Sequence, residues 1–144
     1  GCHVHEKFSV EAIVKLKQEH PEAVVMAHLE CKAPVLAVAD VKGSTATMLH
    51  YAQEHPEIKE YIIATEAGIL HELERNCPNV IFYPVPPEVS EGGIGCSCNE
   101  CEYMKMNTLK KIYNALKFGW PTVEVAEDIA KDAVKPIEKM LSLS

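Results

Sequence analysis

The chain has 144 residues, of which 47% are apolar and 24% charged, so it can bury a core and is not a disordered chain. Its formal net charge of −7 argues against a general nucleic-acid surface, because phosphate binding needs clustered Lys and Arg. The longest apolar run, residues 35–41, is short and contains Asp40, so we expect no membrane-spanning segment.

Residue patterns predict alternating helices and short strands as far as residue 87. Ser9 can cap a first helix that runs to about His20, and Pro21 ends it. Three short apolar runs are typical of buried parallel strands, at residues 23–27, 61–64 and 80–83. Helices are expected between them, at residues 34–39, from 45 to just before Pro56, and at 69–75. This order predicts an α/β fold, a three-layer αβα unit with a short parallel sheet.

The last third of the chain is predicted to hold a cysteine-rich loop and C-terminal helices. These helices are expected from about 104 to 117 and from about 123 to 143, and Pro136 should kink or split the second one. We therefore divide the chain into an α/β domain, residues 1–95, and a loop with C-terminal helices, residues 96–144.

Cysteines are the clearest chemical signal. Cys96, Cys98 and Cys101 lie within six positions on a loop that leads into a helix, which suits a metal ion or an iron–sulfur cluster. The alternative is a surface loop with idle thiols. The six cysteines are not spread as a disulfide framework, so we expect reduced thiols and a cytoplasmic protein. Cys2, three residues before His5, is either a distant ligand that joins Cys101 or an exposed terminal thiol.

Further candidate residues lie where the predicted strands end, because parallel sheets bind ligands beyond the carboxyl ends of their strands. These ends carry His28, Glu30, Cys31, Thr65 and Glu66. His28 and Glu30 leave the first strand on the same side, as an acid–base pair or as a hydrogen-bonded pair that only finishes the strand. Ser44 and Thr45 follow Gly43 at a helix N-terminus, which can hold an anion, although a plain N-cap is the commoner case.

Five stretches of this chain, taken together, resemble the quinolinate synthase (NadA) family of NAD biosynthesis. They occur in family order and cover nearly the whole chain: residues 1–5 (GCHVH), 27–31 (AHLEC), 42–45 (KGST), 64–68 (ATEAG) and 101–109 (CEYMKMNTL). The resemblance implies one of three similar α/β domains around a pocket that holds a [4Fe–4S] cluster, with one cysteine ligand from each domain. It also implies a transferase that condenses iminoaspartate with dihydroxyacetone phosphate to quinolinate, with the open iron as Lewis acid.

The same resemblance assigns roles to individual residues. Cys2 and Cys101 are similar to cluster ligands of the second and third domains, and the third cysteine ligand is expected from amino-terminal domains that this chain lacks. Glu30 resembles the proton-transfer carboxylate, with His28 as its catalytic partner. Substrate-binding roles are implied for His5, His28, Ser44 and Thr45. We expect the chain alone to be inactive.

A zinc-stabilised small α/β binding module without catalysis is the alternative. In that case Cys96, Cys98, Cys101 and a histidine would form a structural site. Metal analysis separates the two hypotheses, because zinc is colourless whereas an iron–sulfur cluster is brown.

Overall fold

A computed structural model describes residues 2–87 and 99–143 of the chain. Contacts between residues divide the chain into two units, Gly1–Lys105 and Met106–Ser144, which are described separately below. The division expected between residues 95 and 96 falls outside the described residues and stays a prediction.

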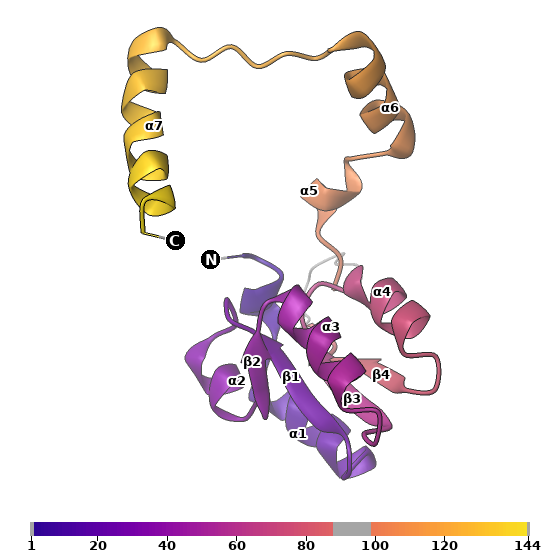
Figure 1. The fold of residues 1–144 in the computed structure, drawn as a ribbon. Coiled ribbons are helices and arrows are strands. Elements are labelled where there is room, and N and C mark those ends of the chain that lie inside the picture. The colour runs from indigo at the N-terminus through magenta and orange to yellow at the C-terminus, as the bar shows by residue number, and fades with distance from the viewer. Residues whose placement is uncertain (1, 88–98, 144) are drawn as a thin grey trace, which may run out of the picture. The chain divides into compact units, whose positions relative to one another are not determined.

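The first unit is built on a four-stranded sheet with all strands parallel (Figure 1). Its spatial order is β2-β1-β3-β4, formed by β1 (Val24–His28), β2 (Val41–Gly43), β3 (Glu60–Ala64) and β4 (Ile81–Pro84). Met26 of β1 pairs with Val41 on one side and with Ile63 on the other. The α/β class is confirmed. β2 was not predicted, because three residues that include Lys42 and a glycine give no strand pattern.

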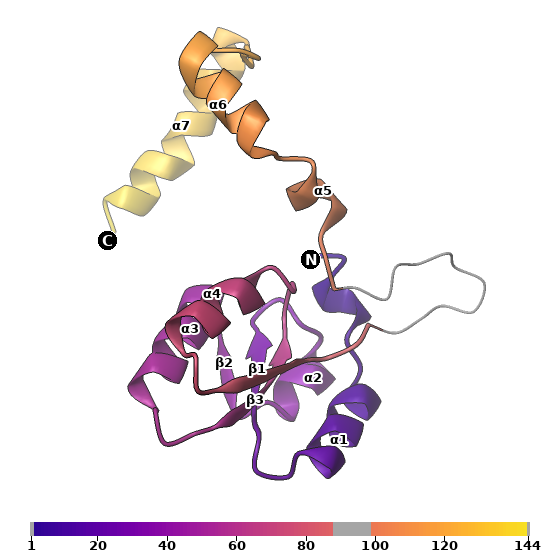
Figure 2. The same ribbon diagram turned by 90° about the vertical axis from the view of Figure 1, so that its right-hand side faces the viewer.

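Helices cover both faces of this sheet (Figure 2). They are η1 (His5–Lys7), α1 (Val10–Glu19), α2 (Ala33–Ala37), α3 (Thr45–Glu54) and α4 (Ile69–Asn76). Alternate strand residues point to opposite faces. Val25 and Ile62 therefore pack in the same cluster as residues of α1 and α2, whereas Met26 and Ile63 pack with residues of α3 and α4. The predicted three-layer αβα unit is confirmed.

Serine side chains cap two helices of the first unit, α1 and α3. Ser9 accepts a hydrogen bond from the backbone N–H of Ala12 at 3.3 Å and caps α1, as the sequence predicted. The short helix α5 (Glu102–Lys105) ends this unit, directly after Cys101. Among the described residues, no helix is long and apolar enough to cross a membrane.

The second unit contains α6 (Leu109–Phe118) and α7 (Glu127–Leu141). The single helix predicted from about 104 to 117 was wrong, because Thr108 caps α6 through the N–H of Lys111 and so starts a new helix. Gly119 ends α6 in the left-handed region at φ 62°, a conformation that favours glycine. Pro136 lies inside α7, which continues through it and is not split.

Candidate functional site

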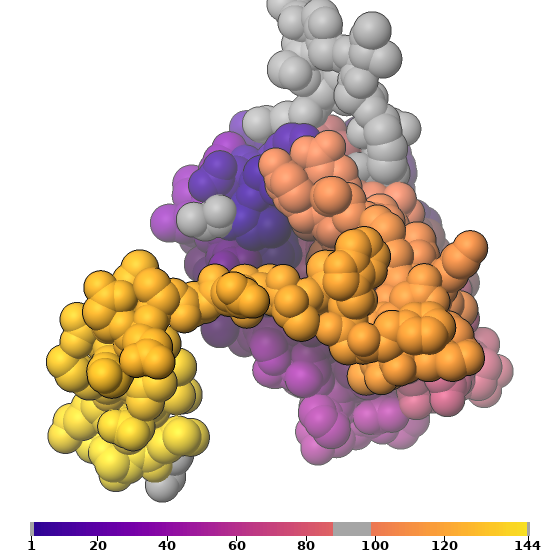
Figure 3. Space-filling model, turned by 90° about the horizontal axis from the view of Figure 1, so that it is seen from above, coloured from indigo at the N-terminus to yellow at the C-terminus, as the bar shows by residue number. Residues whose placement is uncertain are grey.

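A cavity of about 470 Å³ opens in the first unit at the carboxyl ends of β1 and β3. Residues 2–5 and residues 100–105, both in the first unit, border this end of the unit and lie side by side (Figure 3). Six of the seven site residues expected from the sequence line the cavity: Cys2, His5, His28, Glu30, Thr45 and Cys101. Ser44 is not among the lining residues.

His5 is the most constrained side chain of the cavity. It lies in η1, is 5% exposed, and uses both ring nitrogens. Nδ1 lies 3.1 Å from Oε2 of Glu30, and Nε2 lies 3.0 Å from the hydroxyl oxygen of Thr65. The imidazole therefore joins the N-terminal segment to the ends of two neighbouring strands.

The hydrogen-bond partners of His5 define its protonation. The Glu30 carboxylate can only accept, so Nδ1 carries the proton and donates it, and Nε2 of the neutral ring accepts from the Thr65 hydroxyl. Burial lowers the pKa of His5, as does the neighbouring His28, although the hydrogen bond to Glu30 opposes the shift. His5 is thus a neutral imidazole at pH 7.

His28 ends β1 and stacks on the ring of His5, with centroids 4.2 Å apart and planes 4° from parallel. Its Nδ1 accepts a hydrogen bond from the backbone N–H of Glu30 at 3.2 Å, so Nε2 carries the proton of the neutral ring. The Glu30 side chain is 51% exposed. His5 thus holds one oxygen of the Glu30 carboxylate. Because the Glu30 side chain is half-exposed, the carboxylate stays accessible from the cavity.

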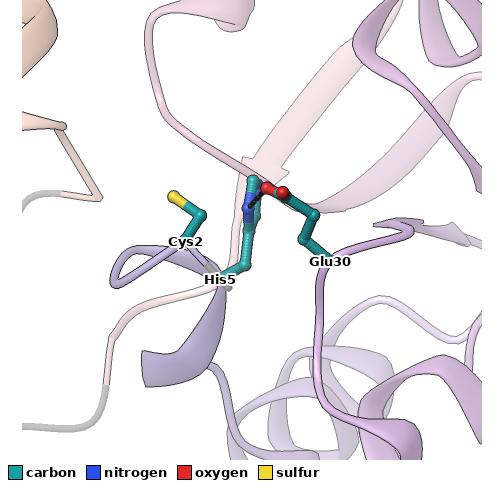
Figure 4. Close-up of side chains that lie close together, drawn as sticks. All are labelled: Cys2, His5 and Glu30. Atoms are coloured by element: carbon teal, nitrogen blue, oxygen red, sulfur yellow. Dashed lines mark hydrogen bonds and ion pairs between the residues drawn. The ribbon is translucent and has the colours of Figure 1, made fainter. Parts of the chain in front are cut away.

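Cys2, His5 and Glu30 form a group that could hold a metal ion, since one ligand atom from each lies within 4.8 Å of the others (Figure 4). Thiolate, imidazole and carboxylate are all common metal ligands. Cys101 is a second free thiol lining the same cavity and is buried. Cys31 stands apart, because burial raises its pKa to about 11 and keeps it a neutral thiol.

Ser44 and Thr45 begin α3, beside the cavity. Ser44 is the N-cap, accepting from the backbone N–H of Thr47 at 3.2 Å, and Thr45 lines the cavity. Gly43 is required here, because a Cβ at this position would lie 2.5 Å from the Thr47 side chain. The Ser44 hydroxyl thus serves the N-cap, and a second role in anion binding stays a prediction.

Thr65 and Glu66, which the sequence analysis places at a strand end without a specific role, directly follow β3 and line the cavity. Their importance follows from strand order, because β3 lies directly beside β1 and brings the Thr65 hydroxyl to His5. Cys96 and Cys98 lie outside the described residues, so the zinc site expected from them is not tested.

This geometry defines an α/β protein with a pocket of thiol, imidazole and carboxylate groups at the carboxyl ends of a parallel sheet. A family profile described as quinolinate synthetase A protein (NadA) matches residues 1–142. The chain belongs to this family.

Curated relatives agree with the family profile. The quinolinate synthase of Prochlorococcus marinus (strain MIT 9303) is 46% identical over 142 residues, which are 99% of this chain and 41% of that protein. Those of Nostoc sp. (strain PCC 7120) and Chloroherpeton thalassium are 45% and 43% identical over 144 residues, the whole of this chain and 43% of each relative. The chain thus spans less than half the length of these relatives.

Proposed function

We propose that this chain forms part of a quinolinate synthase, a transferase that condenses iminoaspartate with dihydroxyacetone phosphate to quinolinate in cytoplasmic NAD biosynthesis. One observation carries the proposal. Cys2 and Cys101, far apart in the sequence, line one cavity together with the hydrogen-bonded pair His5 and Glu30. Family membership supports the same activity.

The donor set of the cavity fits a [4Fe–4S] cluster held in part by this chain. Cys2 and Cys101 are free thiols on the same cavity, and thiolates are the usual ligands of such clusters. The third cysteine would come from sequence outside this chain. When bound, the cluster supplies a Lewis-acidic iron that polarises a substrate oxygen.

Glu30 would move protons during imine formation and dehydration. Its carboxylate is half-exposed at the cavity and its orientation is fixed by the Nδ1–H of His5, as proton transfer requires. The Nε2–H of His28 can donate to a substrate oxygen, because Nδ1 is used by the backbone of Glu30. The N-terminus of α3, with Thr45, would hold an anionic group of the substrate.

The charge of the cavity indicates that other parts of the protein complete it. Three carboxylates line it, those of Glu30, Glu66 and Glu72, and among the described lining residues there is no Lys or Arg. Both substrates are anionic, so binding them beside these carboxylates calls for positive groups in addition to the N-terminus of α3. We infer that these groups come from segments beyond this chain, as does the third cluster ligand.

The experiment is a quinolinate assay of the Glu30→Gln variant. It uses the intact protein, meaning this chain together with the remaining domains of a full-length quinolinate synthase. We expect kcat to fall by about a hundredfold, because the amide cannot accept the proton, with a much smaller change in KM. Glu74→Gln, an exposed carboxylate on α4, is the control and should keep the wild-type rate. Full activity of the Glu30 variant, or no quinolinate from the wild-type protein, would contradict the proposal.

A further inference from the structure

Glu66 is a buried carboxylate that the sequence places at a strand end without a specific role, and the proposed reaction does not use it. It follows β3 and is 9% exposed. Its two oxygens accept from two different segments: Oε2 from the backbone N–H of Gly68 at 2.7 Å, and Oε1 from the backbone N–H of Cys101 at 3.2 Å. Hydrogen bonds to a charged acceptor are about twice as strong as neutral ones.

Two more hydrogen bonds attach residues 99–101 to the loops that follow β3 and β4. The backbone N–H of Ala67 donates to the carbonyl oxygen of Asn99 at 2.8 Å, and the side-chain amide of Asn99 donates to the carbonyl oxygen of Val85. Asn99 is itself buried. The chain just before Cys101 is therefore attached beyond the ends of β3 and β4, and Glu66 makes the contact at Cys101 itself.

Gly68 shows how closely the carboxylate fits. A Cβ at this position would lie 2.6 Å from Oε2 of Glu66, which is too close for any side chain to be accommodated without displacing the carboxylate. The backbone φ of Gly68 is −59°, which alanine also adopts. The constraint on residue 68 is thus the space that Glu66 occupies, and not the backbone conformation.

We propose that Glu66 is a positioning residue that holds Cys101 at the cavity. With its backbone N–H fixed, the Cys101 thiol can move only by rotation about a single side-chain bond. Glutamine has the same shape but only one acceptor oxygen, so its NH₂ group would face one of the two N–H donors. We call the hydrogen bond from the Cys101 N–H to Glu66 the clamp. The clamp does not depend on the proposed function; only the identity of the ligand that Cys101 binds rests on that function.

The first test measures alkylation of each cysteine by iodoacetamide in cluster-free protein, resolved by peptide mass mapping. In Glu66→Gln we expect the rate at Cys101 to rise about tenfold, because a buried charge-assisted hydrogen bond is lost. Rates at the buried Cys31 and Cys77 should not change, since the sheet and its packing are untouched.

Two further variants separate position from charge. Gly68→Ala displaces the carboxylate but keeps its charge, and should raise the Cys101 rate to a similar extent. Glu72→Gln removes a charge from the same cavity without touching the clamp, and should leave the rate within about twofold of wild type. The proposal is overturned if Cys101 reacts at the wild-type rate in both Glu66→Gln and Gly68→Ala. The proposal is also overturned if the alkylation rates of Cys101, Cys31 and Cys77 all rise together, because that would indicate a general loss of packing in the fold.

A second test uses the intact protein with its cluster. Glu66→Gln should speed chelator-driven loss of the cluster absorbance by about tenfold, as expected when the support of a ligand is removed. An unchanged rate would count against the positioning role. Wild-type protein that assembles no cluster would refute the proposed function, whereas the alkylation result would still decide the role of Glu66.

Discussion

At the scale of single residues, the Thr65 hydroxyl helps to fix the His5 ring in the cavity. It donates to Nε2 of His5 and so leaves the proton on Nδ1, facing Glu30. Thr65→Val keeps the shape but leaves a buried ring nitrogen without its donor. We expect a loss of about 1–3 kcal/mol in the free energy of unfolding, measured by urea denaturation.

Nitrogen NMR of the histidine rings gives a second readout for the same variant. The wild-type chain should show the Nδ1–H form of His5, and Thr65→Val should keep it, because the Glu30 carboxylate still accepts that proton. A wild-type His5 protonated on Nε2 would contradict this account of the site.

His5 should also make stability depend on pH. Its pKa in the folded protein lies below the 6.5 of an exposed histidine, mainly because it is buried. The unfolded chain therefore takes up this proton first as the pH falls. The stability contributed by neutral His5 is present above pH 6.5 and is lost as the pH falls from there through the lowered folded pKa.

Urea unfolding of cluster-free protein between pH 7.5 and about pH 5 measures this effect. His5→Gln should lose less stability on acidification than wild type, whereas His50→Gln, at an exposed position on α3, should follow the wild-type curve. Identical pH dependence of wild type and His5→Gln would exclude the effect.

Sequence reasoning placed some site residues for physical reasons and others only by resemblance. Strand alternation predicts His28 and Glu30 on one side of the first strand, and both line the cavity, although β1 ends at His28 and Glu30 lies in the turn beyond it. The approach of Cys2 to the cavity of Cys101 could not be derived from spacing, because it depends on the path of the whole chain between them. Strand pattern also places Thr65 and Glu66 at this edge of the sheet, whereas their hydrogen bonds to His5 and Cys101 depend on the folded chain.

At the scale of elements, local capping explains both the success and the failure of the predicted boundaries. The Ser9 cap correctly predicts the start of α1. The apolar pattern from about 104 to 117 predicts one helix, whereas the Thr108 cap separates α5 from α6. β2 was missed because strand patterns need more than three residues. The alternation of apolar runs and helices nevertheless determined the layered fold.

Ser44 offers a prediction at this scale, because a capping role and a substrate role respond differently to substitution. Ser44→Ala should lower stability by about 1 kcal/mol, whereas Ser44→Gly should cost only a few tenths, since glycine is tolerated at the N-cap. If the hydroxyl also binds substrate, both variants should raise KM to a similar extent in the intact protein. A KM that rises only in the less stable variant would leave Ser44 as a cap alone.

At the scale of the whole molecule, the proposed function makes this chain one side of a shared site. It covers 41–43% of the relatives compared here, and its cavity has two thiols and no described Lys or Arg. Under the proposed function, a cluster with three cysteine ligands and two anionic substrates would require the rest of the protein.

The cluster content of the intact protein, purified without oxygen, tests the central claim most directly. Iron, acid-labile sulfide and visible absorbance should indicate one [4Fe–4S] cluster per chain, and Cys2→Ser and Cys101→Ser should each abolish it. Cys77→Ser, a buried thiol that does not line the cavity, should leave it unchanged. A cluster that survives both Cys2→Ser and Cys101→Ser, or colourless protein that holds zinc instead, would contradict the account.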